Sequence, residues 1–449
     1  MKKKLLILIS LALALVSVLS ACVRLPIGNN NEATDGVMSE TAGKTDETTG
    51  STLKMEANLF INGVNVTEYT LIYDSTAAVG STHARNYFNT TLEAEYGVEL
   101  EKSKTAVEGY NIFIGVLGTD ASITEFYNSA EDGMLGYDGK NVYLLAKDNS
   151  QLYDVVDAFF AKATDDGSID VTQNEKITVI GDSIKVMSYN VLYDEYYDDK
   201  LPRDINKLAE FIASEAPDVF GTQETQNFHR KAILAAMPNY ECYTGVVLKG
   251  GAQMQNMIFW NADKFKMVDY GFRYLTDTPF IESKIPESNS YRGYSFVVLE
   301  SLETHKQFLF VNTHLTYRNA NGATNDDTPR YKQAGHLKTF LENKKYSKMP
   351  IVLVGDFNSV VESNTIGLLE DVKRLDRAAK VAEQKGDTWG TCTGSNETER
   401  LKYVFDHIFV TSDRITTSYY TTLNEESKNL DNGRYLSDHL PVIANITIY

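Results

Sequence analysis

Polar residues suited to chemistry stand at the ends of several apolar runs in the second half of this 449-residue sequence. The apolar run 351–354 is followed by two of them, Asp356 and Asn358. Because Pro350 and Gly355 bound the run, it predicts a short buried strand. Carboxylate and amide groups at the end of a buried strand must form hydrogen bonds, bind a ligand or line a cleft. An Asx-type turn is the alternative interpretation of this stretch alone.

Four other predicted strand ends carry similar polar groups. They are Ser188-Tyr189-Asn190, Gln223-Glu224, Asn312-Thr313-His314 and Ser437-Asp438-His439. A further predicted strand, 403–410, contains Asp406 and His407 within an apolar run. So many polar interruptions in one domain are hard to explain as independent features of a core, and we expect them to share a function.

Together and in this order, the motifs resemble the endonuclease/exonuclease/phosphatase superfamily, which includes deoxyribonuclease I, apurinic endonucleases and neutral sphingomyelinases. The resemblance covers residues 184–449. It implies a four-layer α/β/β/α sandwich, with two sheets face to face and helices outside. It also implies hydrolysis of a phosphate ester with the help of Mg²⁺ or Mn²⁺.

The resemblance implies a metal site. Glu224 matches the principal metal-binding glutamate of the family, Asn190 matches an asparagine near metal and phosphate, and Asp438 adds a second carboxylate. Oxygen ligands of this kind suit a hard cation such as Mg²⁺ or Mn²⁺. The sequence has no Cys/His cluster with the spacing of a zinc site.

The resemblance also implies catalytic roles. Asp356 and Asn358 match the pair that orients the attacking water and the phosphate oxygens. Asp406 matches the aspartate that holds the histidine of the Ser-Asp-His motif, here His439, and favours its imidazolium form. His314 matches a second histidine, suited to act as general acid to the leaving oxygen. The sequence does not identify the acidic partner that usually accompanies it.

Several residues keep two interpretations. Arg330 and Gln333 resemble an Arg-x-x-Gln feature of some branches, so Arg330 either contacts a phosphate or forms a surface ion pair. Taken alone, His314 is more often a hydrogen-bonded strand-end histidine than a catalyst. His336 and His407 have no motif support, and we expect them to be structural.

The beginning of the chain has the pattern of an export signal. Lys2, Lys3 and Lys4 precede the apolar run 5–19, which is shorter than the ~20 residues of a transmembrane helix. The following Ser20-Ala21-Cys22 resembles the bacterial lipoprotein box. By this resemblance residues 1–21 are a signal peptide and Cys22 is lipidated. The protein would then be extracytoplasmic and anchored to the cell membrane. An ordinary signal peptide with an incidental Cys22 is the alternative.

The rest of the chain is expected to be organised as a tether and two domains. Residues 22–54 are poor in apolar side chains and predict a disordered linker. Residues 55–182 predict a smaller α+β domain with a hairpin at 135–145 and helices at 77–96 and 152–160. This domain contains no group of polar residues that suggests catalysis, so we expect it to be a spacer or a binding module. In the catalytic domain, residues 184–449, helices are expected to begin at Pro202 and Pro329.

Composition limits the function further. The net charge is −18, without the basic excess of proteins that rely on nonspecific attraction to duplex DNA. If Cys22 is lipidated, Cys242 and Cys392 remain, and the sequence leaves open whether they pair or are two small buried residues.

These patterns predict a lipid-anchored, metal-dependent phosphoesterase: a phosphodiesterase, nuclease or phosphatase. Its substrate is a phosphate ester, either a lipid head group, a nucleic acid or a small diester, because the fold alone does not settle the substrate. No obligate protein partner is inferred. The alternative is a catalytically inactive surface binding protein on the same fold. We favour the enzyme because every matched polar residue is present.

Overall fold

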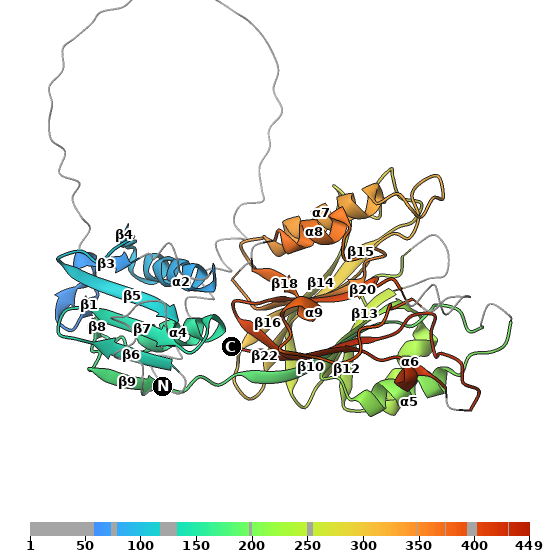
Figure 1. Cartoon of the computed structure of the whole chain (residues 1–449), viewed down its shortest axis with the longest axis horizontal. Helices are drawn as coiled ribbons and strands as arrows, with labels where there is room; N and C mark the ends of the chain where they lie inside the picture. The colour runs from blue at the N-terminus through green and yellow to red at the C-terminus, as the bar shows by residue number, and fades with distance from the viewer. Residues whose placement is uncertain are drawn as a thin grey trace, which may run out of the picture. The chain divides into compact units, whose positions relative to one another are not determined.

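The computed structural model describes residues 58–72, 79–116, 133–196, 200–248, 255–346, 348–372, 374–392, 402–429 and 431–449 (Figure 1). The chain divides into two units, Met1–Leu53 and Lys54–Tyr449. The expected signal peptide, Cys22 and most of the linker fall in the first unit and lie outside the described residues. Among the helices that are described, none is long and apolar enough to cross a membrane.

The first part of the second unit contains a six-stranded mixed sheet with the order β4-β3-β5-β7-β6-β9. Its strands are β3 (Tyr69–Ile72), β4 (Glu101–Ser103), β5 (Tyr110–Val116), β6 (Gly133–Tyr137), β7 (Val142–Ala146) and β9 (Asn174–Ile177). Helices α2 (Val79–Tyr96) and α4 (Leu152–Ala161) share its apolar core through Phe88 and Phe159. The predicted hairpin and both predicted helices are confirmed.

Three short strands, β1 (Phe60–Ile61), β2 (Val64–Asn65) and β8 (Ser168–Ile169), form a separate sheet. Before β3 the chain turns at Asn62 and Gly63, both with positive φ, and this turn joins β1 to β2.

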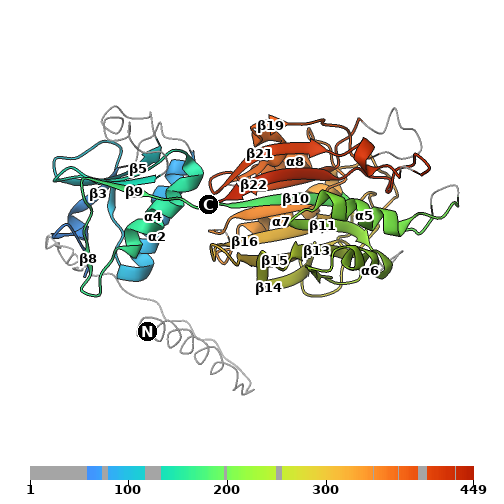
Figure 2. The same cartoon turned by 90° about the horizontal axis from the view of Figure 1, so that it is seen from below.

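Residues 182–449 contain two larger sheets. The seven-stranded sheet has the order β12-β13-β11-β10-β22-β21-β19 and the six-stranded sheet β14-β15-β16-β17-β20-β18 (Figure 2). The first comprises β10 (Asp182–Asn190), β11 (Val219–Thr225), β12 (Tyr240–Tyr243), β13 (Gln255–Asn261), β19 (Gln384–Lys385), β21 (Ile415–Thr422) and β22 (Val442–Ile448). The second comprises β14 (Phe265–Tyr274), β15 (Gly293–Ser301), β16 (Gln307–His314), β17 (Ile351–Asp356), β18 (Leu375–Arg377) and β20 (Asp406–Thr411).

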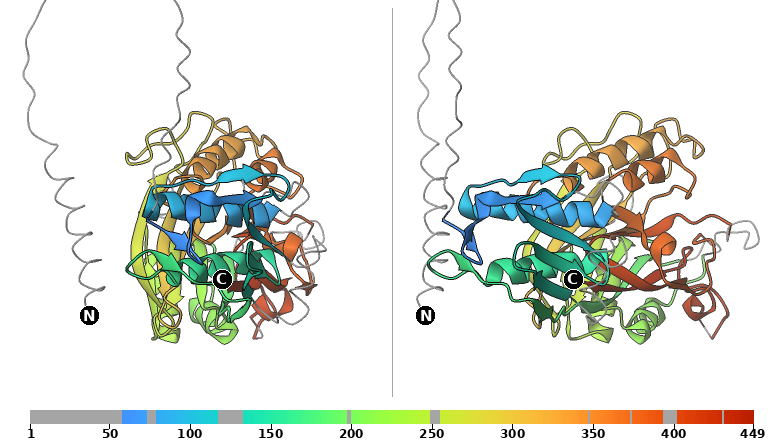
Figure 3. Two further views of the ribbon diagram at one scale, coloured as in Figure 1. Left: turned by 90° about the vertical axis from the view of Figure 1, so that its left-hand side faces the viewer. Right: turned by 60° about the vertical axis from the view of Figure 1, so that its left-hand side comes forward.

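Apolar side chains of both sheets, such as Val186 and Val352, form one shared core. Helices α7 (Thr328–Leu341) and α8 (Asn364–Glu370) pack with residues of the six-stranded sheet in a second core (Figure 3). Helices α5 (Ile205–Glu215) and α6 (Asn227–Ala236) pack with the seven-stranded sheet in a third. The fold is therefore a mixed α+β fold with several sheets and few helices.

Two predicted boundaries are corrected. Helix α5 begins at Ile205 and not at Pro202, because the Asp204 side chain accepts the backbone N–H of Lys207 as an N-cap. Strand β20 begins at Asp406, so the residues of the apolar run that precede Asp406 lie outside the strand. Helix α7 carries Pro329 in its first turn, one residue after its start at Thr328.

Candidate active site

The sheet register brings the predicted polar residues together. Strands β10 and β11 are parallel and place Asn190 beside Gln223. Strands β16 and β17 are also parallel and place His314 beside Asp356, while antiparallel β20 places Asp406 on the other side of Asp356. The register therefore places polar side chains from the ends of different strands next to one another.

Hydrogen bonds join these groups across the two sheets. Nδ2 of Asn190 in β10 donates to Oδ2 of Asp356 in β17 at 3.0 Å. The Ser437 hydroxyl donates to the backbone carbonyl of Asn190 at 2.6 Å, which places the Ser-Asp-His segment against β10. Gln223 donates to the Asn312 side chain at 2.7 Å, a fully buried cross-link between the sheets.

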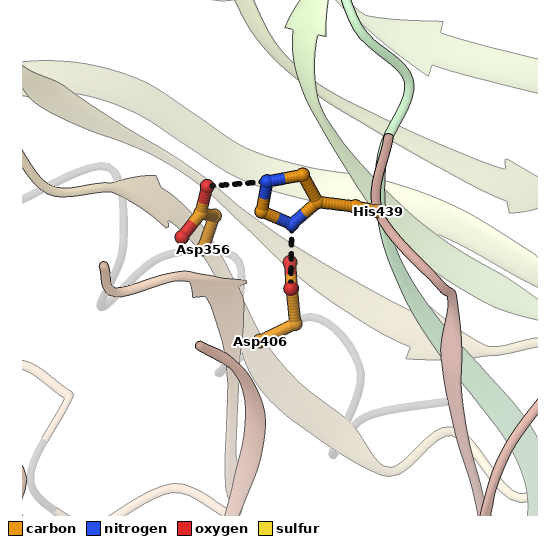
Figure 4. Close-up of side chains that lie close together, drawn as sticks. All are labelled: Asp356, Asp406 and His439. Carbon is orange, nitrogen blue, oxygen red and sulfur yellow. Dashed lines mark hydrogen bonds and ion pairs between the residues drawn. The ribbon is translucent and has the colours of Figure 1, made fainter. Parts of the chain in front are cut away.

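His439 lies between two carboxylates, Asp406 and Asp356 (Figure 4). Its Nδ1 is 2.8 Å from Oδ2 of Asp406, and its Nε2 is 3.7 Å from Oδ2 of Asp356. Burial opposes a charge on the ring, but these two carboxylates outweigh it and raise the pKa of His439 well above its usual value. The site therefore favours an imidazolium at this position.

Asp356 is almost completely buried. Burial raises its pKa to about 7, and the nearby His439 opposes this shift. A carboxyl group with this pKa exchanges a proton near neutral pH, as a general base requires. The backbone N–H of Asn358 and the amide of Asn190 hold its two oxygens in place.

His314 has a different environment. Burial and the nearby charges of Arg292 and His439 lower its pKa well below the usual value. Its Nε2 lies 3.1 Å from Nδ2 of Asn358 and 3.4 Å from Oδ2 of Asp356. A neutral ring that accepts the Asn358 N–H at Nε2 has no proton there for a leaving oxygen. With the ring neutral, the nearby Asp356 oxygen forms no ion pair with this nitrogen.

Glu224 and Asp438 are a further pair of neighbouring carboxylates. Burial and the negative charge of Asp438 raise the pKa of Glu224, which shows that the two carboxylates repel each other. A divalent cation held by both would offset that repulsion, and such cations prefer oxygen ligands, so the two residues fit a divalent metal ion. One Glu224 oxygen is already fixed, since it accepts the backbone N–H of Tyr193 at 3.2 Å.

Backbone conformation sets the direction of these side chains. Glu224 has a φ of 57° and lies where the pairing of β11 with β13 shifts between Thr222 and Thr225. Asn358 and Leu192 also have positive φ, at 48° and 56°. Such conformations cost roughly 1–3 kcal/mol each and cluster at functional sites. Here they occur beside predicted catalytic and metal-binding residues.

Two residues of this site are not part of any motif in the sequence. Arg292 precedes β15, and its charge acts on both Glu224 and Asp356. Thr391 is fully buried, and its hydroxyl accepts the backbone N–H of Phe405 and Asp406 at 2.9 and 3.1 Å. Both lie outside the predicted motifs, so only the tertiary structure identifies them.

The remaining polar residues of the sequence analysis are structural. Arg330 forms an ion pair with Asp327 at 3.1 Å and donates to the backbone carbonyl of Tyr317, so of the two interpretations the structure shows the ion pair, although the arginine itself is buried. Gln333 accepts the backbone N–H of Thr316. His407 is buried, with Nε2 3.0 Å from the Ser359 carbonyl, as expected of a structural histidine.

His336 is half-buried, with Nε2 4.0 Å from an oxygen of Asp277. Cys242 and Cys392 are both free thiols, which answers the question of whether they pair.

The sequence of residues 187–439 matches the Endonuclease/Exonuclease/phosphatase family, and the chain belongs to this family. Its members hydrolyse phosphoesters and generally use divalent metal ions. Comparison with curated proteins gave no match.

Solved structures show the same fold. A family protein from Bacteroides thetaiotaomicron is 22% identical, with a TM-score of 0.52 over 60% of this chain and 99% of that one. A second, from Bacteroides vulgatus, is 20% identical, with a TM-score of 0.53 over 60% of this chain and 100% of that one. The mannosyl-6-phosphatase of Bacteroides thetaiotaomicron is 23% identical, with a TM-score of 0.51 over 59% of this chain and 99% of that one.

Proposed function

We propose that residues 184–449 form a metal-dependent phosphoesterase with the four-layer α/β/β/α architecture of its family. The observation that carries this proposal is the position of His439 between Asp406 and Asp356. An imidazolium stabilised in this way can neutralise negative charge on a phosphoryl group. Asp356 beside it can accept the proton of the attacking water.

Glu224, Asp438 and Asn190 are the residues that we assign to the metal. When bound, Mg²⁺ or Mn²⁺ polarises the phosphoryl group and offsets its developing charge. The group formed by Asp356, Asp406 and His439 is a less suitable site, although its ligand atoms lie within 4.8 Å of one another. Both ring nitrogens of His439 face carboxylates, and a metal ligand needs a lone pair at one of them.

The other side chains have positioning roles in this proposal. Asp406 holds Nδ1 of His439 and thereby its ring orientation. Asn358 donates to the Leu315 carbonyl at 3.0 Å and contacts His314, so its amide is fixed from two sides. We propose that His314 orients Asn358, in place of the general-acid role considered from the sequence.

A catalytically inactive surface binding protein is the rival function. The site favours the enzyme, because its predicted metal and catalytic side chains are all retained and their contacts are internally consistent. A screen of phosphomonoesters and phosphodiesters with purified protein tests this directly. We expect hydrolysis that EDTA abolishes and Mg²⁺ or Mn²⁺ restores. If the protein binds a phosphate ester but hydrolyses none with Mg²⁺ or with Mn²⁺, it is a binding protein and not an enzyme.

We further propose that Cys22 carries a lipid that anchors the protein outside the cytoplasm, and that residues 55–182 act as a spacer or binding module. Support for the anchor comes from the sequence pattern of residues 1–22. Cys22→Ser should move the protein from the membrane fraction to the soluble fraction. Unchanged membrane association of this variant would contradict the anchor.

A further inference from the structure

Arg203 is a buried arginine that lies directly before Asp204, the N-cap of α5, and belongs to none of the predicted motifs. Only 7% of the residue is exposed. Its two terminal nitrogens donate to four backbone carbonyls. Nη1 donates to Leu192 at 2.7 Å and to Asp194 at 2.6 Å, and Nη2 donates to Val191 at 2.7 Å and to Leu436 at 2.6 Å. These acceptors belong to two segments that are far apart in the sequence.

The first segment, residues 191–194, directly follows Asn190, one of the proposed metal ligands. The backbone N–H of Leu192 donates to Oδ1 of Asn190 at 3.1 Å. Leu192 has a φ of 56°, a conformation that costs energy and persists only where the surrounding contacts enforce it. The hydrogen bond from Arg203 to the Leu192 carbonyl is such a contact. Arg203 therefore helps to fix the side-chain oxygen of Asn190.

The same segment contacts the second proposed ligand, Glu224. The backbone N–H of Tyr193 donates to Oε2 of Glu224 at 3.2 Å. Tyr193 lies between Leu192 and Asp194, and the carbonyls of these two residues both accept Nη1 of Arg203. The guanidinium therefore fixes the backbone on both sides of the residue that binds Glu224.

The second segment carries the third proposed ligand, Asp438. Leu436 lies two residues before Asp438, and its carbonyl accepts Nη2 of Arg203. Ser437, which lies between them, donates to the backbone carbonyl of Asn190 at 2.6 Å. Two separate hydrogen bonds therefore hold the Asp438 segment near the end of β10, and Arg203 supplies one of them.

Arg330 is buried to a similar degree but connects residues that are close in sequence. Its acceptors lie within residues 316–327, which join β16 to α7. Arg203 instead joins residues 191–194 to Leu436. A guanidinium holds its donors in a rigid planar fork, so it can fix carbonyls of two segments at defined positions, which the single ammonium of a lysine does not reproduce.

We propose that Arg203 is a positioning residue that holds the segments of Asn190, Glu224 and Asp438 together and so prepares them to bind a divalent cation. This rests on the proposed function, in which these three side chains bind the metal. Arg203 acts through backbone carbonyls, so it should affect the affinity for the ion more than the chemical step. Partners that orient metal ligands typically contribute roughly 10- to 100-fold to metal affinity.

The experiment compares wild type with Arg203→Gln and Arg203→Lys, and uses Mn²⁺ as the probe. Calorimetry measures the affinity of the metal-free protein for Mn²⁺. Thermal melts in EDTA and in saturating Mn²⁺ record folding and the stabilisation that the ion provides. Hydrolysis measured against Mn²⁺ concentration gives the half-saturating concentration and the limiting kcat. Arg330→Lys is the matched control, because it changes a buried arginine whose acceptors lie in one connection.

We expect Arg203→Gln to bind Mn²⁺ roughly 10- to 100-fold more weakly than wild type. Arg203→Lys should lose less affinity, because its ammonium can still donate to one segment. The half-saturating Mn²⁺ concentration for hydrolysis should rise by the same factor as the dissociation constant, and saturating Mn²⁺ should restore most of the wild-type kcat. The melting temperature in EDTA should fall in all three variants, since each loses buried hydrogen bonds. The Mn²⁺ affinity of Arg330→Lys should equal that of wild type.

Several results would overturn the inference. A folded Arg203→Gln variant with wild-type affinity for Mn²⁺ would show that Arg203 does not prepare the metal site. An equal loss of affinity in Arg330→Lys would show that the effect is not specific to Arg203. If both Arg203 variants fail to fold while Arg330→Lys folds, Arg203 is a residue of folding. A loss of kcat that saturating Mn²⁺ does not restore would contradict a positioning role.

Metal binding separates this inference from the proposed function. If wild type binds Mn²⁺ in a manner that depends on Arg203 but hydrolyses no phosphate ester, only the enzyme is refuted. If wild type hydrolyses phosphate esters and its Mn²⁺ affinity does not depend on Arg203, only this inference is refuted. A wild-type protein that binds no Mn²⁺ would refute both.

Discussion

The two described regions, residues 58–177 and 182–449, both bury polar side chains beside a mixed sheet, but they satisfy them differently. In the first region, Asn111 bonds the backbone of Val107 and Gly109, and Asn89 bonds the backbone of Leu100. In the second, Asp356 and His439 face other ionisable side chains. Polar groups bound to backbone complete a fold, whereas ionisable groups directed at one another prepare a site for reaction.

Residues with positive φ are also distributed unevenly between the two regions. Among described residues other than glycine, the first region has one positive φ, at Asn62 in a tight turn that asparagine tolerates well. Among its described residues the second region has seven, of which Leu192, Glu224 and Asn358 belong to the proposed site or adjoin it, while the others lie elsewhere: Lys200, Ala216, His305 and Arg374. The predictions below test this contrast, from the largest expected effect to the smallest.

The largest effect is expected at Asp356. Asp356→Asn keeps the shape and removes the base, so we expect kcat/KM to fall roughly 10²–10⁴-fold. Because the base acts when deprotonated, the wild-type rate should rise with pH through a pKa of about 7, and the variant should lose this rise. Rates measured between pH 5 and 9 check both expectations. If the variant keeps the increase of rate with pH, a residue other than Asp356 is the base.

His439 and Asp406 should behave as one unit. His439→Ala is expected to lower the rate by roughly 10²–10⁴-fold, and Asp406→Asn by less, since it disturbs only orientation and charge. The double variant should lose less than the product of the single losses, because both act on the same transition state. Steady-state kinetics of the three variants measures this coupling, and multiplicative losses would show that the two residues act independently.

A smaller effect concerns stability and pH. Burial lowers the pKa of His407 from 6.5 to about 4, so the folded protein keeps this ring neutral. The contribution of the neutral His407 ring to the stability of the folded protein is complete above pH 6.5. It is lost as the pH falls, because the ring is protonated in the unfolded chain before it is protonated in the folded one. At pH 5 the loss amounts to about 2 kcal/mol. The free energy of unfolding, measured with urea at pH 7 and at pH 5, should decrease less for His407→Asn than for wild type. Equal decreases in the two proteins would show that His407 does not cause the loss of stability at low pH.

The smallest effect is expected in the first region. Asn111→Ala removes buried hydrogen bonds to the backbone and to the Asn141 side chain. It should lower the free energy of unfolding by about 1–3 kcal/mol, while kcat/KM stays unchanged. Urea unfolding and kinetics on the same preparation test both parts. A selective loss of activity in the folded variant would contradict the division between the two regions.

The sequence predicts much of this arrangement where the information is local. Apolar runs that end in polar residues, such as the one before Asp356, give strands and their ends, and helical spacing gives α4. Arg292 could not be predicted, because its position depends on the pairing of β15 with β16 and on the burial that results. The lowered pKa of His314 likewise follows from burial and from neighbours distant in sequence.

The register shift in β11 has a consequence for how this protein can change during evolution. Strand residues alternate between faces, so a single inserted or deleted residue reverses the side to which the following residues point. Between Thr222 and Thr225 the chain already contains one irregularity, and Glu224 depends on it for its direction. Loss of one residue there would turn Glu224 away from Asp438 without altering any side chain. Chain length at this point is therefore under stricter constraint than in the surface loops, where insertions are tolerated.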